Sequence, residues 1–461
     1  MNRPLIRSNI PGIIFPSIPG QEAAVQMALQ FQFEQSQWWP QKDLVAYQFN
    51  QLRHLLNFAF QHSSFWKEKA EEAGLNRRWI KQLTPKTFSQ LPILKRSELQ
   101  QQLDKIRPKQ TPKEHGPLSQ TKTSGSTSTP ITAYGTGVTR ALWHAFSIRD
   151  HLWHKRDFRL KLAAIRSVPM DVARAPNGIV KQGWATSVGR VFASGQSMML
   201  NVTEPVHVQY KWLLKHNPHY LITHPSNLMA LARHAKGASK KLTNLRQIRG
   251  VGEIVTQTLR DQVDAVFGCK IADMYSCQES GYIALQCPEK GNYHVMSEGI
   301  YLEVVDDKGR PLPAGNQGRV LITNLNNFAT PMIRYELGDM AVLGKPCRCG
   351  RGLPVLDKIF GRVRNMVVMP DGSTHWPYFG FSDFIKVADI RQFQIVQHDL
   401  ETVEFKLVTD HPLSVNQERK ITSILQKSLT HPFNIRFTYL DHIPKSKSGK
   451  YEDFISKVPQ F

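Results

Sequence analysis

The sequence has no long apolar run. No uncharged apolar stretch approaches the ~18 residues that a membrane-spanning helix needs, so a membrane-spanning protein is excluded. The apolar patch Ile13–Phe15 near the N-terminus is short and lies between prolines, which disfavours a secretory signal and favours a cytoplasmic location. Internal repeats and long low-complexity tracts are also absent.

Cysteine and acidic residues are scarce. Five cysteines in 461 residues, without a secretory signal, argue against a disulfide framework. Lys and Arg number 59 against 37 Asp and Glu, which gives a formal net charge of +22. Such a field attracts nucleic acid, anionic lipid or the polyphosphate of a nucleotide, and charge alone leaves these alternatives open.

The length indicates two or three domains, because domains usually run ~100–200 residues. Apolar residues recur at helical spacing in the first third, as around Leu52. The middle alternates short strands and helices, and from Ile300 a period of two indicates antiparallel strands. We therefore expect an α/β fold with a large multi-layer N-terminal domain over residues 1–361, helical at its start over about 20–110, and a small α+β C-terminal domain over 362–461.

Three polar segments could carry chemistry. The hydroxyl-rich run Thr123–Pro130, with one glycine, offers many N–H and O–H donors that can wrap phosphate oxygens, although such runs are more often linkers. In Arg334–Asp339, a carboxylate on a glycine turn can accept both ribose hydroxyls, or it can be a surface turn. In Pro444–Lys450, a flexible lysine can neutralise phosphate charge, or the segment can be a solvated basic tail.

Taken in order, these segments resemble the motifs of the adenylate-forming acyl-CoA ligase superfamily, most closely its phenylacetate–CoA ligase-like branch, which includes capsule-biosynthesis-type proteins. The resemblance covers nearly the whole chain. It is carried by the phosphate loop Thr123–Pro130, the adenine-side segment Gly250–Glu253, the Tyr-Gly-x-Thr-Glu motif at Tyr275–Glu279, the Tyr-Arg-Thr-Gly-Asp motif at Arg334–Asp339, the hinge pair Gly361-Arg362 and the C-terminal Ser448-Gly449-Lys450.

The resemblance implies a role for each matching residue. Lys450, Glu279 and Arg362 would be catalytic, with Glu279 also holding Mg²⁺. Arg364 would be the hinge about which a mobile C-terminal domain turns. The ATP- and AMP-binding residues would be Thr123, Ser124, Gly125, Ser126, Thr127, Gly252, Glu253, Tyr275, Gln278 and Asp339.

The resemblance also implies a reaction. ATP, Mg²⁺ and a small-molecule carboxylic acid, expected to be aromatic, would give an acyl-AMP, whose acyl group then passes to a thiol, expected to be coenzyme A. A carrier-protein pantetheine, an amine or a sugar remains an alternative acceptor. Ser128-Thr129 replaces the usual Gly-Lys, and Ser276 and Gln278 replace glycine and threonine, so a catalytically degenerate relative also remains open.

A basic nucleic-acid-binding protein is the alternative from another class. The sequence disfavours it, because Lys and Arg are scattered and no groove-reading motif is present. We therefore expect no nucleic-acid partner. A homodimer is compatible with the sequence, which does not encode the oligomeric state in any recognisable way.

Four residues could bind zinc. Cys287, His294, Cys347 and Cys349 provide three thiols and one imidazole, which is a tetrahedral zinc set, and Cys-x-Cys followed by glycine resembles a zinc knuckle. By resemblance to some relatives in the branch, they would form a structural zinc site that uses all four coordination positions. The alternative is two unrelated groups of reduced cysteines.

Overall fold

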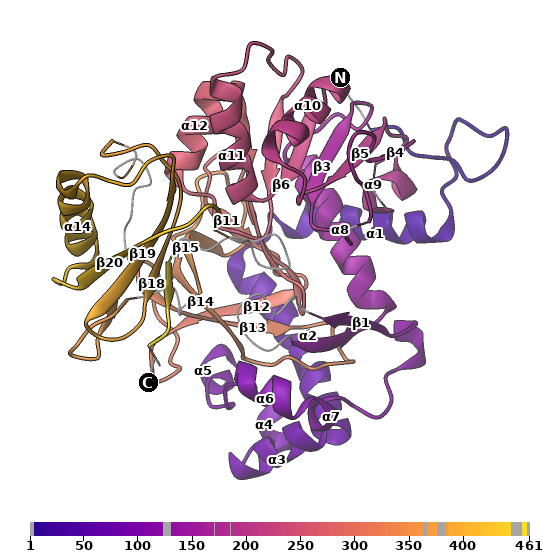
Figure 1. Ribbon diagram of the computed structural model, residues 1–461. Helices are drawn as coiled ribbons and strands as arrows, with labels where there is room; N and C mark the ends of the chain where they lie inside the picture. Colours follow the sequence, from indigo (N-terminus) through magenta and orange to yellow (C-terminus); the bar gives the residue numbers. More distant parts are fainter. Residues whose placement is uncertain are drawn as a thin grey trace.

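The computed structural model describes residues 4–122, 131–169, 171–184, 186–362, 367–375, 384, 386–443 and 454–458. They form a helical layer, two large β-sheets and a separate C-terminal sheet (Figure 1). The architecture is α/β, with a large N-terminal domain and a small C-terminal domain, as the sequence predicts. The boundary between residues 361 and 362 stays a prediction.

The first third of the chain is helical. Leu52, Leu55 and Leu56 lie on one face of a long helix and are fully buried, which confirms the predicted apolar stripe. The next helix is capped by Ser63, whose side chain accepts from the backbone N–H of Trp66. The helices are α1 (Gln21–Ser36), α2 (Gln41–His62), α3 (Ser64–Glu72), α4 (Arg77–Lys81), α5 (Pro85–Phe88), α6 (Arg96–Gln101) and α7 (Leu103–Ile106).

A six-stranded sheet forms the centre of the large domain, in the order β4-β5-β3-β6-β7-β8, and only β4 runs antiparallel to its neighbour. One face packs on α10, α11 and α12, and the other on α8 and α9. The strands are β3 (Leu162–Arg166), β4 (Ile179–Lys181), β5 (Ser197–Asn201), β6 (Tyr220–Thr223), β7 (Gln247–Gly250) and β8 (Lys270–Ala272). The helices are α8 (Gly137–Trp153), α9 (Thr186–Val191), α10 (Val206–His216), α11 (Pro225–Lys236) and α12 (Gln257–Phe267).

A seven-stranded antiparallel sheet follows, in the order β12-β13-β14-β15-β11-β10-β9. The predicted hairpin is confirmed, because Tyr301 pairs with Thr323 and Val305 with Arg319. The strands are β9 (Met274–Cys277), β10 (Gly281–Gln286), β11 (Tyr293–Val295), β12 (Ile300–Val305), β13 (Gln317–Asn324), β14 (Tyr335–Leu343) and β15 (Val355–Arg362).

The C-terminal sheet has its own apolar core, which includes Phe393, Phe405 and Leu425. Its helix α14 begins after Ser414, whose side chain accepts from the backbone N–H of Gln417. Arg233 of α11 donates from its guanidinium to the Arg391 carbonyl at 2.6 Å, which joins the two domains. The elements are β16 (Val367–Val368), β17 (Thr374–His375), β18 (Ile390–Gln397), β19 (Thr402–Thr409), α14 (Val415–Leu429), β20 (Asn434–Tyr439) and β21 (Phe454–Ser456).

No helix among the described residues is both long enough and apolar enough to cross a membrane.

Candidate active site

The two large sheets meet where β8 runs into β9, with only Asp273 between them. Just beyond, the Tyr275 hydroxyl donates a hydrogen bond to Asp339 Oδ2 at 2.6 Å. Three strands separate β9 from β14 in the sheet order, so this contact requires a strongly curled sheet. Burial and the neighbouring Asp339 carboxylate raise the pKa of Tyr275 well above its ordinary value, so the phenol keeps its proton and remains a donor.

Arg362 and Glu279 both lie near the Tyr275–Asp339 contact, since Arg362 pairs with Asp339 and the charge of Glu279 acts on Tyr275. Arg362 is opposite Asp339 in the register of β14 and β15. Glu279 follows β9 in a turn, and its side chain is only 6% exposed. Its Oε1 accepts from the Tyr335 hydroxyl at 3.5 Å and lies 3.9 Å from the Arg96 guanidinium. Four predicted residues, Tyr275, Glu279, Asp339 and Arg362, are thus brought together from distant parts of the chain.

The other predicted nucleotide-binding residues lie at strand ends. Gly252, with φ +79°, follows β7, and Glu253 accepts from the backbone N–H of Ser226 at 2.7 Å and from its hydroxyl at 3.0 Å. Glu253 therefore binds the first turn of α11. Gln278 is exposed in the turn before Glu279.

The predicted residues Thr123, Ser124, Gly125, Ser126 and Thr127, the hinge residue Arg364 and the catalytic Lys450 lie outside the described residues. The strands that flank the phosphate loop are described: β1 (Ser119–Lys122) and β2 (Thr132–Gly135) pair antiparallel. Tyr134 in β2 donates its N–H to the Thr330 hydroxyl and accepts at its carbonyl from Asn327, so the start of the loop's outgoing strand is held in place.

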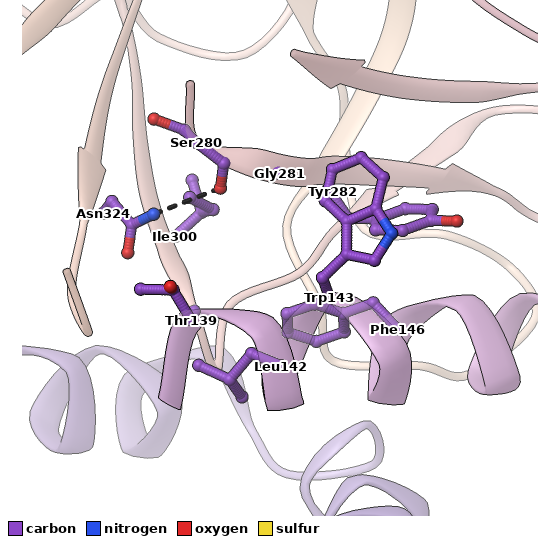
Figure 2. Close-up of a pocket in the computed structure, with 10 residues that line it drawn as sticks. Thr139, Leu142, Trp143, Phe146, Ser280, Gly281, Tyr282, Ile300 and Asn324 are labelled. Atoms are coloured by element: carbon purple, nitrogen blue, oxygen red, sulfur yellow. Dashed lines mark hydrogen bonds between the residues drawn. The ribbon is translucent and has the colours of Figure 1, made fainter. Parts of the chain in front are cut away.

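A small pocket lies beside Ser280 and Gly281, directly after Glu279 (Figure 2). Trp143 of α8 covers Gly281, which has φ +89° and where an added Cβ would lie 3.2 Å from the indole. The Trp143 and Tyr282 rings are 4.9 Å apart. Trp143, Phe146 and Tyr282 give the pocket three aromatic walls, and Thr139, Ser280 and Asn324 add polar groups.

Arg334 is a structural residue, although it opens one of the predicted motifs. It has φ +46° and is buried, with its guanidinium 3.1 Å from both Glu303 oxygens. It also donates to three backbone carbonyls, those of Ser89, Leu91 and Gly309. All its donors are directed into the protein, so Arg334 joins the helical layer to the sheet and is not a ligand-binding cation.

Sequence reasoning missed a buried charged cluster beneath α8. Asp150 Oδ2 lies 2.6 Å from the Arg156 guanidinium and 3.1 Å from Arg249 Nε. Burial acts to raise the pKa of Asp150, but the two arginines hold it well below its ordinary value. Burial lowers the pKa of His154 to about 4 and that of His151 well below its ordinary value, so both are neutral at pH 7, as expected of core histidines. No sequence pattern marks this cluster, because its members look like isolated charges.

The predicted zinc ligands do converge. The four donor atoms of Cys287, His294, Cys347 and Cys349 lie within 4.8 Å of one another. The Cys287 and Cys347 sulfurs are 3.9 Å apart, and Cys349 Sγ lies 3.3 Å from His294 Nε2. Tetrahedral zinc, with Zn–S of about 2.3 Å and Zn–N of about 2.0–2.1 Å, requires about 3.8 and 3.6 Å for such pairs. The donor set and spacing therefore fit zinc.

The surroundings of this cluster also suit a metal. Burial lowers the pKa of His294 to about 4, so its imidazole is neutral, and His294 Nδ1 lies 3.5 Å from the Leu353 carbonyl. Gly350, with φ +88°, donates its N–H to the Cys347 carbonyl and turns the chain between the two thiols. The cluster joins the β10–β11 connection to the β14–β15 connection.

Comparison with known proteins adds two family matches. The AMP-binding enzyme model matches residues 52–330, and the CapK C-terminal domain model matches residues 378–457. The chain is 24% identical to a phenylacetate–coenzyme A ligase of Thermus thermophilus over 344 residues, covering 72% of this chain and 73% of that one. It is 20% identical to the protein CapK of Staphylococcus aureus over 432 residues, covering 90% of each chain.

Solved structures give the same fold. A 2-hydroxyisobutyryl-CoA ligase in the postadenylation state with 2-HIB-AMP matches with a TM-score of 0.71 at 19% identity, covering 92% of each chain. The open conformation of the same ligase, covering 91% of this chain and 93% of that one at 18% identity, gives 0.58.

Proposed function

The chain belongs to the AMP-binding enzyme family, in its phenylacetate–CoA ligase-like branch, and from this premise we propose that it joins an aromatic carboxylic acid to coenzyme A through an acyl-AMP. The observation that carries the proposal is the convergence of Tyr275, Asp339 and Glu279 at the junction of the two sheets, beside an aromatic pocket. The domain boundary at 361/362, the residue roles and the choice of acid and acceptor are all part of this proposal.

In the first step, a carboxylate oxygen attacks the α-phosphorus of ATP and the bond to the leaving pyrophosphate breaks. Both reactants are anions, so the site must orient them and reduce their repulsion. We assign Asp339 to the ribose hydroxyls, held by Tyr275, and Arg362 to ribose and phosphate. Lys450 would meet the developing charge on the phosphates from the C-terminal domain.

Glu279 would hold Mg²⁺. When bound, the ion would neutralise part of the negative charge of the phosphates. One carboxylate beside the phosphates fits the usual preference of Mg²⁺. Arg96, 3.9 Å from Glu279, adds positive charge beside this carboxylate.

In the second step, a thiol attacks the acyl carbonyl, AMP leaves and a thioester forms. The C-terminal domain would turn about Arg364 between the two steps. The matched CapK C-terminal domain makes an acceptor other than coenzyme A the second candidate, because this is the part of the chain that would meet the acceptor.

The test is acid-dependent ATP–pyrophosphate exchange over a panel of aromatic and aliphatic acids, followed by acyl transfer with and without coenzyme A. We expect exchange with an aromatic acid and thioester only when coenzyme A is present. Exchange without thioester would favour the second candidate. A complete lack of exchange, with a correctly folded protein, would refute adenylation and leave a degenerate relative.

We also propose that Cys287, His294, Cys347 and Cys349 hold a structural zinc ion. All four positions of a tetrahedral ion would be protein ligands, so no position stays open for substrate or water.

A further inference from the structure

The carboxyl edge of the six-stranded sheet is open on the face toward α8. Ala164, Ile222 and Arg249 form one row across β3, β6 and β7, and Arg166 lies two residues beyond Ala164 on the same face. Ala164 and Ile222 remain half-buried, although interior strands of a parallel sheet are normally covered on both faces. The row therefore keeps some solvent exposure, at the edge where parallel α/β sheets bind ligands.

Two arginines at this edge lie close together. Asp150 is shared by Arg156 and Arg249, and Asp273 lies 3.9 Å from Arg260. Within the described part of the chain, no hydrogen-bond or ion-pair partner is found for the Arg166 guanidinium, whose side chain reaches solvent. Burial and the charge of the nearby Arg249 lower the pKa of Arg166. Arg166 therefore offers a cation beside Arg249 that no described carboxylate pairs with, while Arg249 shares its carboxylate with Arg156.

Hydrogen bonds hold described residues just after Arg166. Asn201, fully buried at the end of β5, donates from Nδ2 toward the carbonyls of Val168, Pro169 and Val172 at 3.0–3.2 Å. Arg166 itself is the last residue of β3, so its backbone is held by the sheet. A cation on a backbone fixed in this way needs little ordering when a ligand binds.

Tyr282 connects this edge to the aromatic pocket. Its ring lines the pocket beside Trp143 (Figure 2), and its hydroxyl accepts from Arg249 at 2.7 Å. Arg249 pairs with Ala272 in β8, and Tyr275 lies three residues, about 10 Å, farther along the chain. Arg249 therefore contacts the same Tyr282 side chain that lines the pocket.

We propose that the acid activated by this chain carries a second anionic group, a carboxylate or a phosphate, and that Arg166 and Arg249 bind this group. The proposal rests on the proposed function and names its substrate class. Guanidinium groups suit it, because their planar fork matches the oxygens of both anions.

The experiment is ATP–pyrophosphate exchange with three matched aromatic acids: benzoate, its 3-carboxy derivative and its 3-phosphono derivative. In the parent protein we expect one substituted acid to exceed benzoate by about 10- to 100-fold in kcat/KM, the scale of a charge-assisted hydrogen bond. Arg166→Gln should bring that ratio close to one. Arg159→Gln is the matched control, since it removes the same charge just before the other end of β3, where Arg159 pairs with Asp157, and it should keep the ratio.

The outcomes separate the two proposals. Exchange with benzoate equal to or above both substituted acids, or an unchanged ratio in Arg166→Gln, overturns the anion-binding role and leaves adenylation intact. No exchange with these three acids or with any acid of the wider panel overturns the proposed function and this inference with it. Which substituted acid is preferred distinguishes the carboxylate from the phosphate. Because Arg166 is exposed, the variant should fold, and circular dichroism and a melting curve check this.

Discussion

Replacing one ligand of the proposed zinc site tests the metal without reference to catalysis. Cys349→Ser removes a thiolate that lies 3.3 Å from His294 Nε2 and leaves three ligands. A hydroxyl is a far weaker zinc ligand than a thiolate, so we expect purified parent protein to contain one zinc per chain and the variant to contain much less. Cys269→Ala is the matched control, because Cys269 lies in the core of the six-stranded sheet and not in the cluster.

The size of the effect follows from mass action. Free zinc at a thousandfold its dissociation constant stabilises the folded state by about 4 kcal/mol. At roughly 2–4 °C per kcal/mol for a large domain, chelation should lower the melting temperature by roughly 10 °C in the parent. The Cys349→Ser variant should melt near the chelated parent and should respond little to chelator.

A structural zinc ion and a catalytic one would differ in how chelation affects pyrophosphate exchange. The cluster lies at the Gln286 end of β10, whereas Glu279 lies beyond its Gly281 end, and six strand residues span about 20 Å. Pyrophosphate exchange measured well below the melting temperature should therefore survive chelation. If the parent contains no zinc, and serine at each of the four positions leaves the melting curve unchanged, the site does not exist.

Three further predictions concern the active site and its support. Lys450→Ala should lower adenylation by about 10²–10³-fold with the fold retained, the usual effect of losing one preorganised donor, and unchanged pyrophosphate release would contradict its role. Tyr275→Phe should cost about 1.5–3 kcal/mol of unfolding free energy and raise the KM for ATP, because Asp339 loses a charge-assisted hydrogen bond; urea titration and exchange kinetics check this. Burial raises the pKa of Asp273 to about 6, so this group contributes stability that is full below about pH 4 and is lost as pH rises through 6. The loss should be about 3 kcal/mol, and Asp273→Asn should lack it in urea unfolding measured from pH 4 to 7; the same slope in both proteins would show that another group titrates.

Helices with a strongly periodic sequence could be predicted, because the spacing of residues within one segment determines which side chains share a face. The buried face of α2 follows from helical spacing, and the start of α14 follows from its Ser414 cap. By contrast, α1 has little apolar periodicity and packs on α8 through one aromatic stack, Phe33 on Phe146, and through Gln26 and Gln30, which donate to carbonyls of α8. Amphipathic patterning cannot predict such a helix–helix contact.

The candidate site was predictable only where the family motifs describe it. Tyr275 and Asp339 were both singled out, but the hydrogen bond between them depends on the curl of a sheet, which short sequence segments do not encode. Arg334 shows a further limit, because the motif that contains it gives no sign that its side chain is internal. Its partner Glu303 is 31 residues earlier in the chain, so only the fold reveals that the pair is internal.

The net charge of +22 points to a particular ligand only when the positions of the charged side chains in the fold are known. Most Lys and Arg are exposed, and at physiological salt their fields fade within about 8 Å, so they attract anions in general and select none. Arg166 and Arg249 differ, because they lie close to each other and a single carboxylate serves Arg249 and Arg156 together. Arg249 is also buried, and salt screens buried charges poorly. They lie at the carboxyl edge of the sheet, and Arg249 contacts the Tyr282 side chain that lines the aromatic pocket. In the proposed role, they therefore select a substrate with an anionic group at one end, which the net charge alone could not do.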